Sequence, residues 1–286
     1  MNFRELYTRL VDIYERGEAQ AIVRLLLEER FGLTLAEVLG GALEQLSSDK
    51  QRELERMMMR LETGEPIQHV LGTAVFCGRK FSVSPDVLIP RPETEELVGM
   101  VLAHCRGKLS EQETGVPIRL LDIGTGSGCI AVTLALDIPH AAVTAWDVSV
   151  KALQVARANA CRLGAYVTFE EHDALSATAS GCWDVIVSNP PYICCEEADE
   201  MEKNVLSYEP RQALFVPNED PLLFYRAISG MAQEHLAPGG TVFFEINPRF
   251  ALDLQELVKA QGFVQVQCVC DQYGKERFVK FCSPSD

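Results

Sequence analysis

Four consecutive residues, Asn189, Pro190, Pro191 and Tyr192, form the sharpest chemical signal in the sequence, and they follow an apolar run over residues 183–188. Two prolines fix the backbone and remove two amide donors, so the Asn189 amide oxygen and the Pro190 carbonyl oxygen are held as acceptors. Two convergent acceptors suit a planar NH2 group, and Tyr192 offers an apolar face to a flat group. We predict that Asn189, Pro190 and Tyr192 are catalytic and that all four residues bind the substrate. A Pro-Pro pair that only ends a strand is the alternative interpretation.

A glycine-rich loop, Gly124-Thr125-Gly126-Ser127-Gly128, follows a second apolar run and leads into a helical pattern. Glycine lets the backbone turn tightly and approach a ligand closely. A dinucleotide fingerprint would need a third glycine at the position of Cys129. The G-x-G-x-G spacing is instead typical of S-adenosylmethionine sites, so we predict that all five loop residues bind this cofactor, together with Asn189.

Two acidic residues follow the next two apolar runs. Asp147 is suitably spaced from the loop to accept both ribose hydroxyls, and Asp173 is placed to accept the adenine amino group. A role for Asp147 as a helix N-cap ahead of Val150 would explain it equally well. The glycine loop, Asp147 and Asp173 follow three successive predicted strands, and this arrangement favours a cofactor site over an ordinary turn.

A methyl donor beside an amide-binding run predicts methyl transfer to nitrogen. An amide nitrogen is a poor nucleophile because its lone pair is delocalised. Hydrogen bonds that orient it, and that take up positive charge as the N–CH3 bond forms, act mainly in the transition state. Displacement at a sulfonium requires in-line approach, so positioning supplies much of the rate and no acidic general base is required.

A parallel sheet is needed to bring these residues together. From residue 118 onward, strand-like runs alternate with helical patterns, which implies a Rossmann-like α/β domain with a doubly wound, mostly parallel sheet. A short turn at residues 271–275 joins the last two strands, which predicts an antiparallel pair at one edge. We assign residues 90–286 to this domain and residues 67–89 to a β-hairpin linker.

Residues 1–66 have apolar residues at helical spacing and are predicted to form a separate small helical bundle. Ser48 followed by Gln51 resembles a capping box at the start of one helix, and Gly17 and Gly32 suit helix C-termini. Nine basic and 13 acidic residues in this region argue against a nucleic-acid-binding arm.

Composition narrows the function classes further. The 286 residues carry 26 Lys and Arg against 41 Asp and Glu, a net charge of −15, which disfavours direct binding to nucleic acids or anionic membranes. The ten cysteines include no C-x-x-C pair, so we expect no metal site and reduced thiols. The N-terminus lacks an apolar signal region and no stretch is long enough for a membrane span, so we expect a cytoplasmic protein.

Further motifs give the whole chain a family resemblance. It resembles the bacterial protein-(glutamine-N5) methyltransferases that modify peptide chain release factors. Besides the loop and the Asn-Pro-Pro-Tyr run, the resemblance rests on Gly-Glu-Pro-Ile-Gln-His-Val-Leu-Gly at residues 64–72, Ile-Pro-Arg-Pro-Glu-Thr-Glu at residues 89–95 and Tyr-Glu-Pro at residues 208–210.

The resemblance implies a class I methyltransferase domain with a seven-stranded sheet. It also implies methyl transfer from S-adenosylmethionine to the glutamine of the Gly-Gly-Gln loop in class I release factors, which leaves S-adenosylhomocysteine. In the family, the glycine loop, the acid at Asp147 and the residue at Ala174 contact the cofactor, the Asn-Pro-Pro-Tyr run binds the glutamine, and the N-terminal domain grips the release factor. Ala174 departs from the usual aromatic residue, and residues 245–248 lack the usual glycine and glutamine.

Two other functions fit parts of the sequence. A nucleic-acid N-methyltransferase acting on an exocyclic amine would share the Asn-Pro-Pro-Tyr run, although the net charge weighs against it. A non-catalytic cofactor-binding scaffold is disfavoured because both halves of the predicted site are present.

Overall fold

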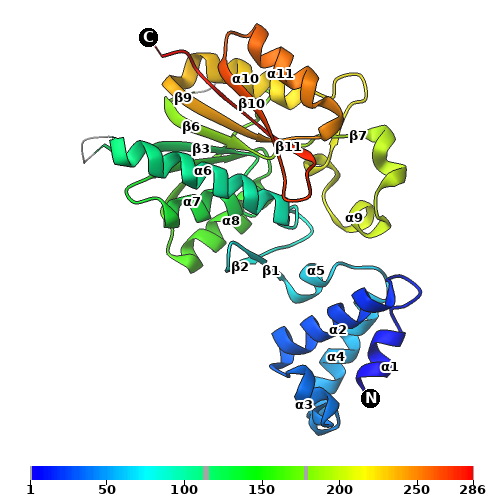
Figure 1. Cartoon of the computed structure of the whole chain (residues 1–286). Helices are drawn as coiled ribbons and strands as arrows, with labels where there is room; N and C mark the ends of the chain where they lie inside the picture. The colour runs from blue at the N-terminus through cyan, green and yellow to red at the C-terminus, as the bar shows by residue number, and fades with distance from the viewer. Residues whose placement is uncertain (1, 112–115, 177–179, 286) are drawn as a thin grey trace. The chain divides into compact units, whose positions relative to one another are not determined.

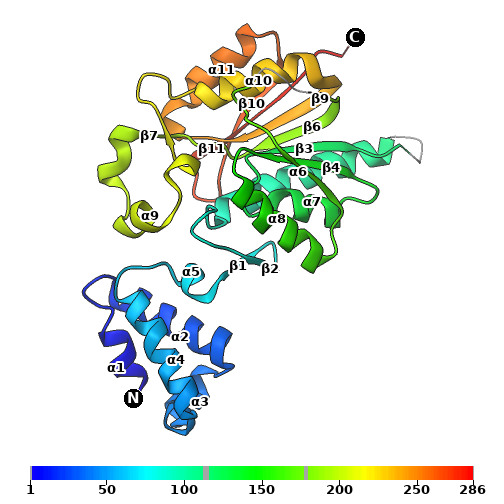
Figure 2. The same ribbon diagram turned by 180° about the vertical axis from the view of Figure 1, so that it is seen from behind.

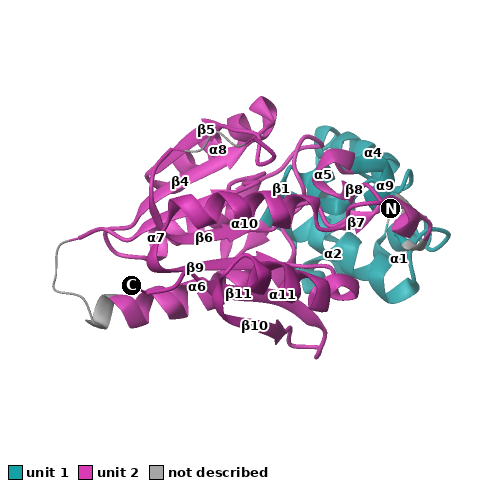
Figure 3. Ribbon diagram, turned by 90° about the horizontal axis from the view of Figure 1, so that it is seen from above, with its two compact units in different colours: residues 1–74, 201–208 teal, residues 75–200, 209–286 magenta. Residues whose placement is uncertain are grey.

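The computed structural model describes residues 2–111, 116–176 and 180–285. The chain divides into two compact units, one made of residues 1–74 and 201–208 and the other of residues 75–200 and 209–286 (Figure 3). We call them unit 1 and unit 2. In the described part of the chain, no helix has both the length and the apolar character needed to cross a membrane.

Unit 1 is helical, as predicted. Its helices are α1 (Phe3–Thr8), α2 (Arg16–Phe31), α3 (Leu35–Leu39), α4 (Ser48–Leu61), α5 (Ile67–Leu71) and α9 (Lys203–Tyr208), with a 3-10 turn at Ala42–Gln45 (Figure 1). The apolar faces of α1 to α5 share one core, which includes the fully buried Leu6, Leu26 and Met58.

Two details of the predicted helix ends are wrong. Ser47, one residue before the predicted cap, is the N-cap of α4, and its hydroxyl accepts from the Lys50 amide. Gly17 lies near the start of α2 rather than at a helix end. Gly32 is confirmed as a C-cap, since it takes the left-handed conformation at φ +69° that glycine tolerates best.

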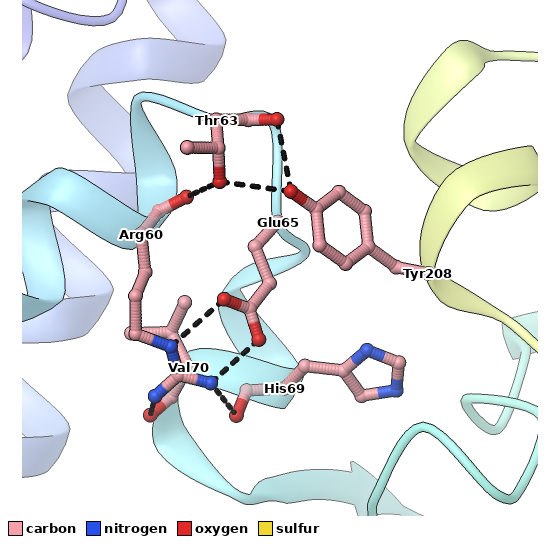
Figure 4. A network of polar contacts seen from close by, with 6 residues as sticks. All are labelled: Arg60, Thr63, Glu65, His69, Val70 and Tyr208. Atoms are coloured by element: carbon pink, nitrogen blue, oxygen red, sulfur yellow. Dashed lines mark hydrogen bonds and ion pairs between the residues drawn. The ribbon is translucent and has the colours of Figure 1, made fainter.

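Arg60 organises the turn between α4 and α5 in unit 1 (Figure 4). Its Nε and Nη2 atoms donate to the two carboxylate oxygens of Glu65 at 2.8 and 2.5 Å. Its guanidinium also donates to the backbone carbonyl oxygens of His69 and Val70. A planar fork with several donors suits this task better than an ammonium group would.

Tyr208 fastens the distant α9 segment to the same turn. Its hydroxyl donates to the carbonyl oxygen of Thr63 at 3.0 Å and lies 2.8 Å from the Thr63 hydroxyl (Figure 4). Residues 201–208 therefore belong to unit 1 although the chain on both sides of them belongs to unit 2.

Unit 2 is built on a seven-stranded sheet in the order β10-β11-β9-β6-β3-β4-β5. Neighbours from β9 to β5 are parallel, whereas β11 runs antiparallel to β9 and β10, so the predicted antiparallel edge is confirmed. The strands are β3 (Arg119–Ile123), β4 (Ala142–Asp147), β5 (Val167–Glu171), β6 (Trp183–Ser188), β9 (Leu236–Glu245), β10 (Val264–Cys270) and β11 (Glu276–Cys282).

Helices cover both faces of this sheet (Figures 1 and 2). One core joins the sheet to α6 (Pro92–Glu111), α7 (Cys129–Asp137) and α8 (Val150–Leu163), and a second joins it to α10 (Leu223–His235) and α11 (Ala251–Ala260). Central strands covered on both faces need continuous apolar runs, which is why Val185, Ile186 and Val187 are all fully buried. Two short pairs complete the unit: β1 (Thr73–Phe76) with β2 (Arg79–Ser82), the predicted hairpin, and β7 (Ile193–Cys194) with β8 (Phe215–Val216).

The strand order reverses between β3 and β6. From β3 the chain proceeds to β4 and β5 on one side and then returns to β6 on the other. In open α/β sheets, ligands bind beyond the carboxyl ends of the strands at such a reversal. Ile123, at the end of β3, pairs with both Ser188 of β6 and Trp146 of β4. The glycine loop, Asp147 and Asn189, each following one of these three residues, therefore start from the same edge.

The fully buried Asn159 links α8 to the hairpin and to the glycine loop. Its Nδ2 atom donates to the carbonyl oxygens of Ser82 and Ser127, both at 2.9 Å, while its Oδ1 atom accepts from the Ser82 amide at 2.7 Å. By bonding both the amide and the carbonyl of Ser82, the Asn159 side chain makes the hydrogen bonds that a neighbouring strand would otherwise make.

We expect Asn159→Ala to lower the free energy of unfolding by about 2–4 kcal/mol, because buried backbone groups lose their partners. Urea unfolding followed by circular dichroism measures this change. Gln154→Ala, on the exposed side of the same helix, is the control and should change stability by less than about 0.5 kcal/mol. Equal effects of the two substitutions would contradict the assigned linkage.

Candidate functional site

A cavity of about 630 Å³ lies at the predicted edge of the sheet in unit 2. Residues from all three strand ends line it, together with two loops, residues 85–88 and residues 210–217, the second of which begins at the proline of the Tyr-Glu-Pro run. Of the predicted site residues, the lining includes Gly124, Gly126, Asp147, Asp173, Ala174, Asn189, Pro190 and Pro191.

The glycine loop divides into residues that face the cavity and residues that support them. Gly124 and Gly126 line the cavity at φ +76° and +54°, and nothing lies within 4 Å of where a Cβ atom would stand. The buried Thr125 turns inward, and its hydroxyl donates to Asp122 at 2.6 Å. Among the described residues, Thr125, Ser127 and Gly128 are not part of the lining. Direct cofactor contact by these three stays a prediction.

Gly128 is needed for packing of the loop against α8 and does not line the cavity. It takes φ +81° at the start of α7, and a Cβ atom there would meet the Cβ and Cα atoms of Ala156 at 3.0 and 3.1 Å. The loop can therefore approach α8 only without a side chain at this position.

Asp122 fastens the loop to the end of β3, a role that sequence reasoning missed. Its Oδ2 atom accepts from the Thr125 hydroxyl at 2.6 Å and from the Ala131 amide at 3.2 Å. Complete burial raises the pKa of this carboxyl to about 7, against the opposing effect of the two hydrogen bonds. A polar residue inside an apolar strand was the signal in the sequence.

Asp147 connects two of the loops at the cavity. Its Oδ2 atom accepts from the Gly126 amide at 2.9 Å, and its Oδ1 atom accepts from the Ser149 amide at 2.8 Å. Ser149, not Asp147, is the N-cap of α8, so the alternative role as a helix cap is wrong. Burial raises the pKa of Asp147 above its usual value. Each carboxylate oxygen keeps a lone pair, which leaves Asp147 able to accept from a pair of hydroxyls.

Asp173 and Ala174 form the wall that follows β5. The Oδ1 atom of Asp173 accepts from the Leu175 amide at 2.9 Å, which fixes the turn. Ala174 brings no aromatic ring to the lining, which there continues with His172, Leu175 and, from α10, Phe224. The wall around Ala174 therefore combines polar and apolar side chains, and position 174 itself adds no aromatic ring.

Asn189 has one clear partner outside the cavity lining. Its Nδ2 atom donates to the hydroxyl of Thr94 at 3.1 Å, and Thr94 in turn donates to Glu245 at 2.7 Å. Tyr192 donates to the other oxygen of the Glu245 carboxyl at 3.1 Å and is not part of the lining. Its role as an apolar face for the substrate stays a prediction, and sequence reasoning assigned no role to Thr94 or Glu245.

Glu209 of the Tyr-Glu-Pro run has a structural explanation within unit 2. The buried Glu209 accepts from the Ile89 amide at 3.0 Å and forms an ion pair with Arg91 at 2.5 Å. This bond ties the two loops that frame the cavity, since residues 85–88 precede Ile89 and Pro210 follows Glu209. Glu209 therefore has a structural role at the rim of the cavity.

The donor set fits a nucleoside carrying a sulfonium side chain better than it fits a metal. Within residues 2–111, 116–176 and 180–285, no group of three or more His, Cys, Asp or Glu side chains could hold a metal ion. The cavity instead offers side-chain-free glycines, a carboxylate with free lone pairs, and apolar walls. Those features match a ribose, a flat base and a close backbone approach.

Comparison with known proteins gives a consistent result. Residues 108–208 match the Methyltransferase small domain, and residues 4–72 match the PrmC N-terminal domain. The chain is 45% identical over 283 residues to the release factor glutamine methyltransferase of Bacteroides thetaiotaomicron, covering 98% of this chain and 99% of that protein. It is 37% identical over 268 residues to the protein of the same name from Bacillus subtilis, covering 93% and 92%.

Solved structures support the fold alone. A methyltransferase from Pyrococcus furiosus superposes with a TM-score of 0.51 at 19% identity, covering 83% of this chain and all of that one. A 16S rRNA methyltransferase from Thermus thermophilus, solved with AdoMet and guanosine, gives a TM-score of 0.51 at 18% identity and covers 74% of this chain and 49% of that one. The predicted class I methyltransferase fold is thereby confirmed.

We expect Gly128→Ala to lower the free energy of unfolding by about 1–3 kcal/mol, because the new methyl group meets Ala156 and the backbone is strained. Urea unfolding measures the loss. Gly99→Ala is the matched control, since Gly99 is exposed in α6 with open space around it, and it should be neutral or stabilising by up to about 1 kcal/mol. A tolerated Gly128→Ala would mean that the loop does not need its close approach to α8.

Proposed function

Because this chain belongs to the family of release factor glutamine methyltransferases, we propose that it methylates the side-chain amide nitrogen of a glutamine in a peptide chain release factor. S-adenosylmethionine is the methyl donor, and S-adenosylhomocysteine is the product. The observation that carries the proposal is the pairing of Ile123 with Ser188, which sets the glycine loop beside Asn189 at one cavity.

The chain's own groups account for cofactor binding. Bound S-adenosylmethionine would supply a methyl group on a positively charged sulfur. Gly124 and Gly126 permit a close backbone approach, Asp147 accepts from ribose hydroxyls, and Asp173 is suited to the base. The carboxylates also favour the positive charge of the sulfonium in a cavity of low dielectric constant.

Asn189 and Pro190 bind and orient the side-chain amide of the substrate glutamine. The oxygen acceptors of both residues suit the two hydrogens of a glutamine NH2 group. Accepting these hydrogens orients the nitrogen and disperses the positive charge that develops on it, which lowers the barrier without a proton acceptor of high basicity. The product loses its proton to solvent after transfer.

The substrate is a folded protein, so recognition needs more surface than the cavity offers. We assign the target to the Gly-Gly-Gln loop of class I release factors in the cytoplasm, as the sequence motifs imply. Unit 1, which is acidic and has its own core, is the proposed docking element for the release factor. Residues 4–72 match the PrmC N-terminal domain, so a separate N-terminal unit is a feature that this chain shares with its family.

Mass spectrometry tests the reaction directly. A purified class I release factor incubated with this protein and S-adenosylmethionine should gain one methyl group on the glutamine of its Gly-Gly-Gln loop.

We expect Asn189→Ala to lower kcat by about 100-fold or more with little change in cofactor affinity. Asp147→Ala should do the reverse and chiefly weaken cofactor binding, as measured by calorimetry.

A release factor that stays unmethylated while the cofactor still binds would overturn the proposed substrate. In that case a nucleic acid substrate is the next to test. Activity on a nucleic acid should fall steeply with salt, since phosphate contacts release counterions.

Removal of residues 1–66 tests the docking role. We expect KM for the release factor to rise by about tenfold or more, because binding energy away from the cavity is lost, while the Kd for S-adenosylmethionine changes by less than about threefold. Cofactor binding by the truncated chain is the control that unit 2 is folded. An unchanged KM would leave unit 1 without a docking role.

A further inference from the structure

A chain of hydrogen bonds runs from the predicted catalytic amide into the core of unit 2. Asn189 Nδ2 donates to Thr94 Oγ1 at 3.1 Å, Thr94 Oγ1 donates to Glu245 Oε2 at 2.7 Å, and Tyr192 donates to Glu245 Oε1 at 3.1 Å. Thr94 and Glu245 are almost fully buried, with 3% and 1% of their surface exposed. They come from the first turn of α6 and the last residue of β9.

The single hydrogen of the Thr94 hydroxyl decides how the Asn189 amide is oriented. Since this hydrogen goes to the Glu245 carboxylate, the Thr94 oxygen can only accept from Asn189. The NH2 end of the Asn189 amide must then face Thr94. The carbonyl end, Oδ1, is left for the cavity that Asn189 lines.

We propose that Thr94 and Glu245 are positioning residues that hold the Asn189 amide with its oxygen toward the substrate. The proposal rests on the proposed function, in which that oxygen accepts from the glutamine NH2 group. A flipped amide would oppose a donor to a donor and would lose this hydrogen bond in the transition state. The two residues thus act through Asn189 and need not touch the substrate.

The carboxyl that anchors the chain is set to lose its proton near neutrality. Burial raises the pKa of Glu245 to about 7, and the nearby Glu93 on α6 also raises it, whereas hydrogen bonds from Thr94 and Tyr192 and the charge of Arg277 on β11 lower it. Tyr225 on α10 is a further titratable neighbour, and its hydroxyl donates to the Glu245 backbone oxygen at 2.9 Å. The ionised carboxylate has no hydrogen to donate and accepts from both of its side-chain donors.

The pH dependence follows from this arrangement. Below about pH 7 a protonated Glu245 can donate to Thr94, whose own hydrogen is then free to turn toward Asn189 and favour the flipped amide. The active orientation is therefore the one present at higher pH. We expect kcat for release factor methylation to rise through about pH 7 and then level off.

Paired substitutions at Thr94 test the inference. Thr94→Val keeps the shape but removes the hydroxyl, and we expect kcat to fall by about 10–100-fold while KM for S-adenosylmethionine stays within about twofold. Thr94→Ser keeps the hydroxyl and should restore most of the rate. Thr94→Val should also flatten the step near pH 7, which a general loss of stability would not do.

Two further variants separate positioning from packing. Glu245→Gln keeps the volume but presents an NH2 group to one of its two donors, so it should resemble Thr94→Val and lack the pH step. Tyr225→Phe removes a buried hydrogen bond to the backbone oxygen of Glu245 but leaves its carboxylate unchanged. This variant should keep the pH step, and adding Thr94→Val to it should still lower kcat. Full activity of Thr94→Val, or an unchanged pH step in it, would overturn the inference.

An activity-independent measurement distinguishes failure of this inference from failure of the proposed function. In protein labelled at asparagine side-chain nitrogens and threonine methyl groups, the Asn189 NH2 protons should show a nuclear Overhauser effect to the Thr94 methyl group at pH 8 that weakens at pH 5.5. Its absence at pH 8 would refute the positioning role. Its presence in a protein that does not methylate a release factor would leave the positioning role intact and refute only the substrate.

Discussion

The parallel pairing of β3 with β4 and β6 is the constraint on which the site depends. Ile123 is in register with Trp146 on one side and Ser188 on the other, so Gly124, Asp147 and Asn189 follow at the same level of the sheet. A slip of one residue would exchange the two faces of a strand and would also displace the loop that follows it. Side chains on both faces of these strands pack into the two cores of unit 2, so such a slip would disrupt the packing on both faces.

The same edge gathers carboxyl groups in places where burial opposes their charge. Burial raises the pKa of Asp122, Asp147 and Glu245 alike. Asp147 and Glu245 accept hydrogen bonds from elements distant along the chain, and Asp122 accepts from the loop and helix that follow its own strand, so the acids act as junctions between elements. Buried polar groups need hydrogen-bond partners. Here the same hydrogen bonds also hold the segments around the cavity in place.

Local features of the site could be predicted from the sequence, but long-range partners could not. The glycine spacing and the Asn-Pro-Pro-Tyr run depend on backbone conformation within a few residues, and alternation of strands and helices predicts the edge at which they meet. Thr94 and Glu245 are 95 and 56 positions from Asn189, and no periodicity relates them. Ser47 and Ser48 show that local prediction is also limited. Either serine could cap α4, and the sequence does not tell which of the two does so in the folded protein.

The chemistry explains why the amide-binding end needs acceptors held by a buried network. A glutamine amide keeps its lone pair in conjugation, so the reaction depends on the angle at which the nitrogen meets the methyl group more than on removal of a proton. An asparagine side chain offers a donor and an acceptor of nearly equal size, and in water its orientation would be undetermined. Its Nδ2 atom is bound to Thr94, whose hydroxyl is in turn committed to a carboxylate. The orientation of a neutral group is thereby determined by a charge that lies two hydrogen bonds away and outside the cavity lining.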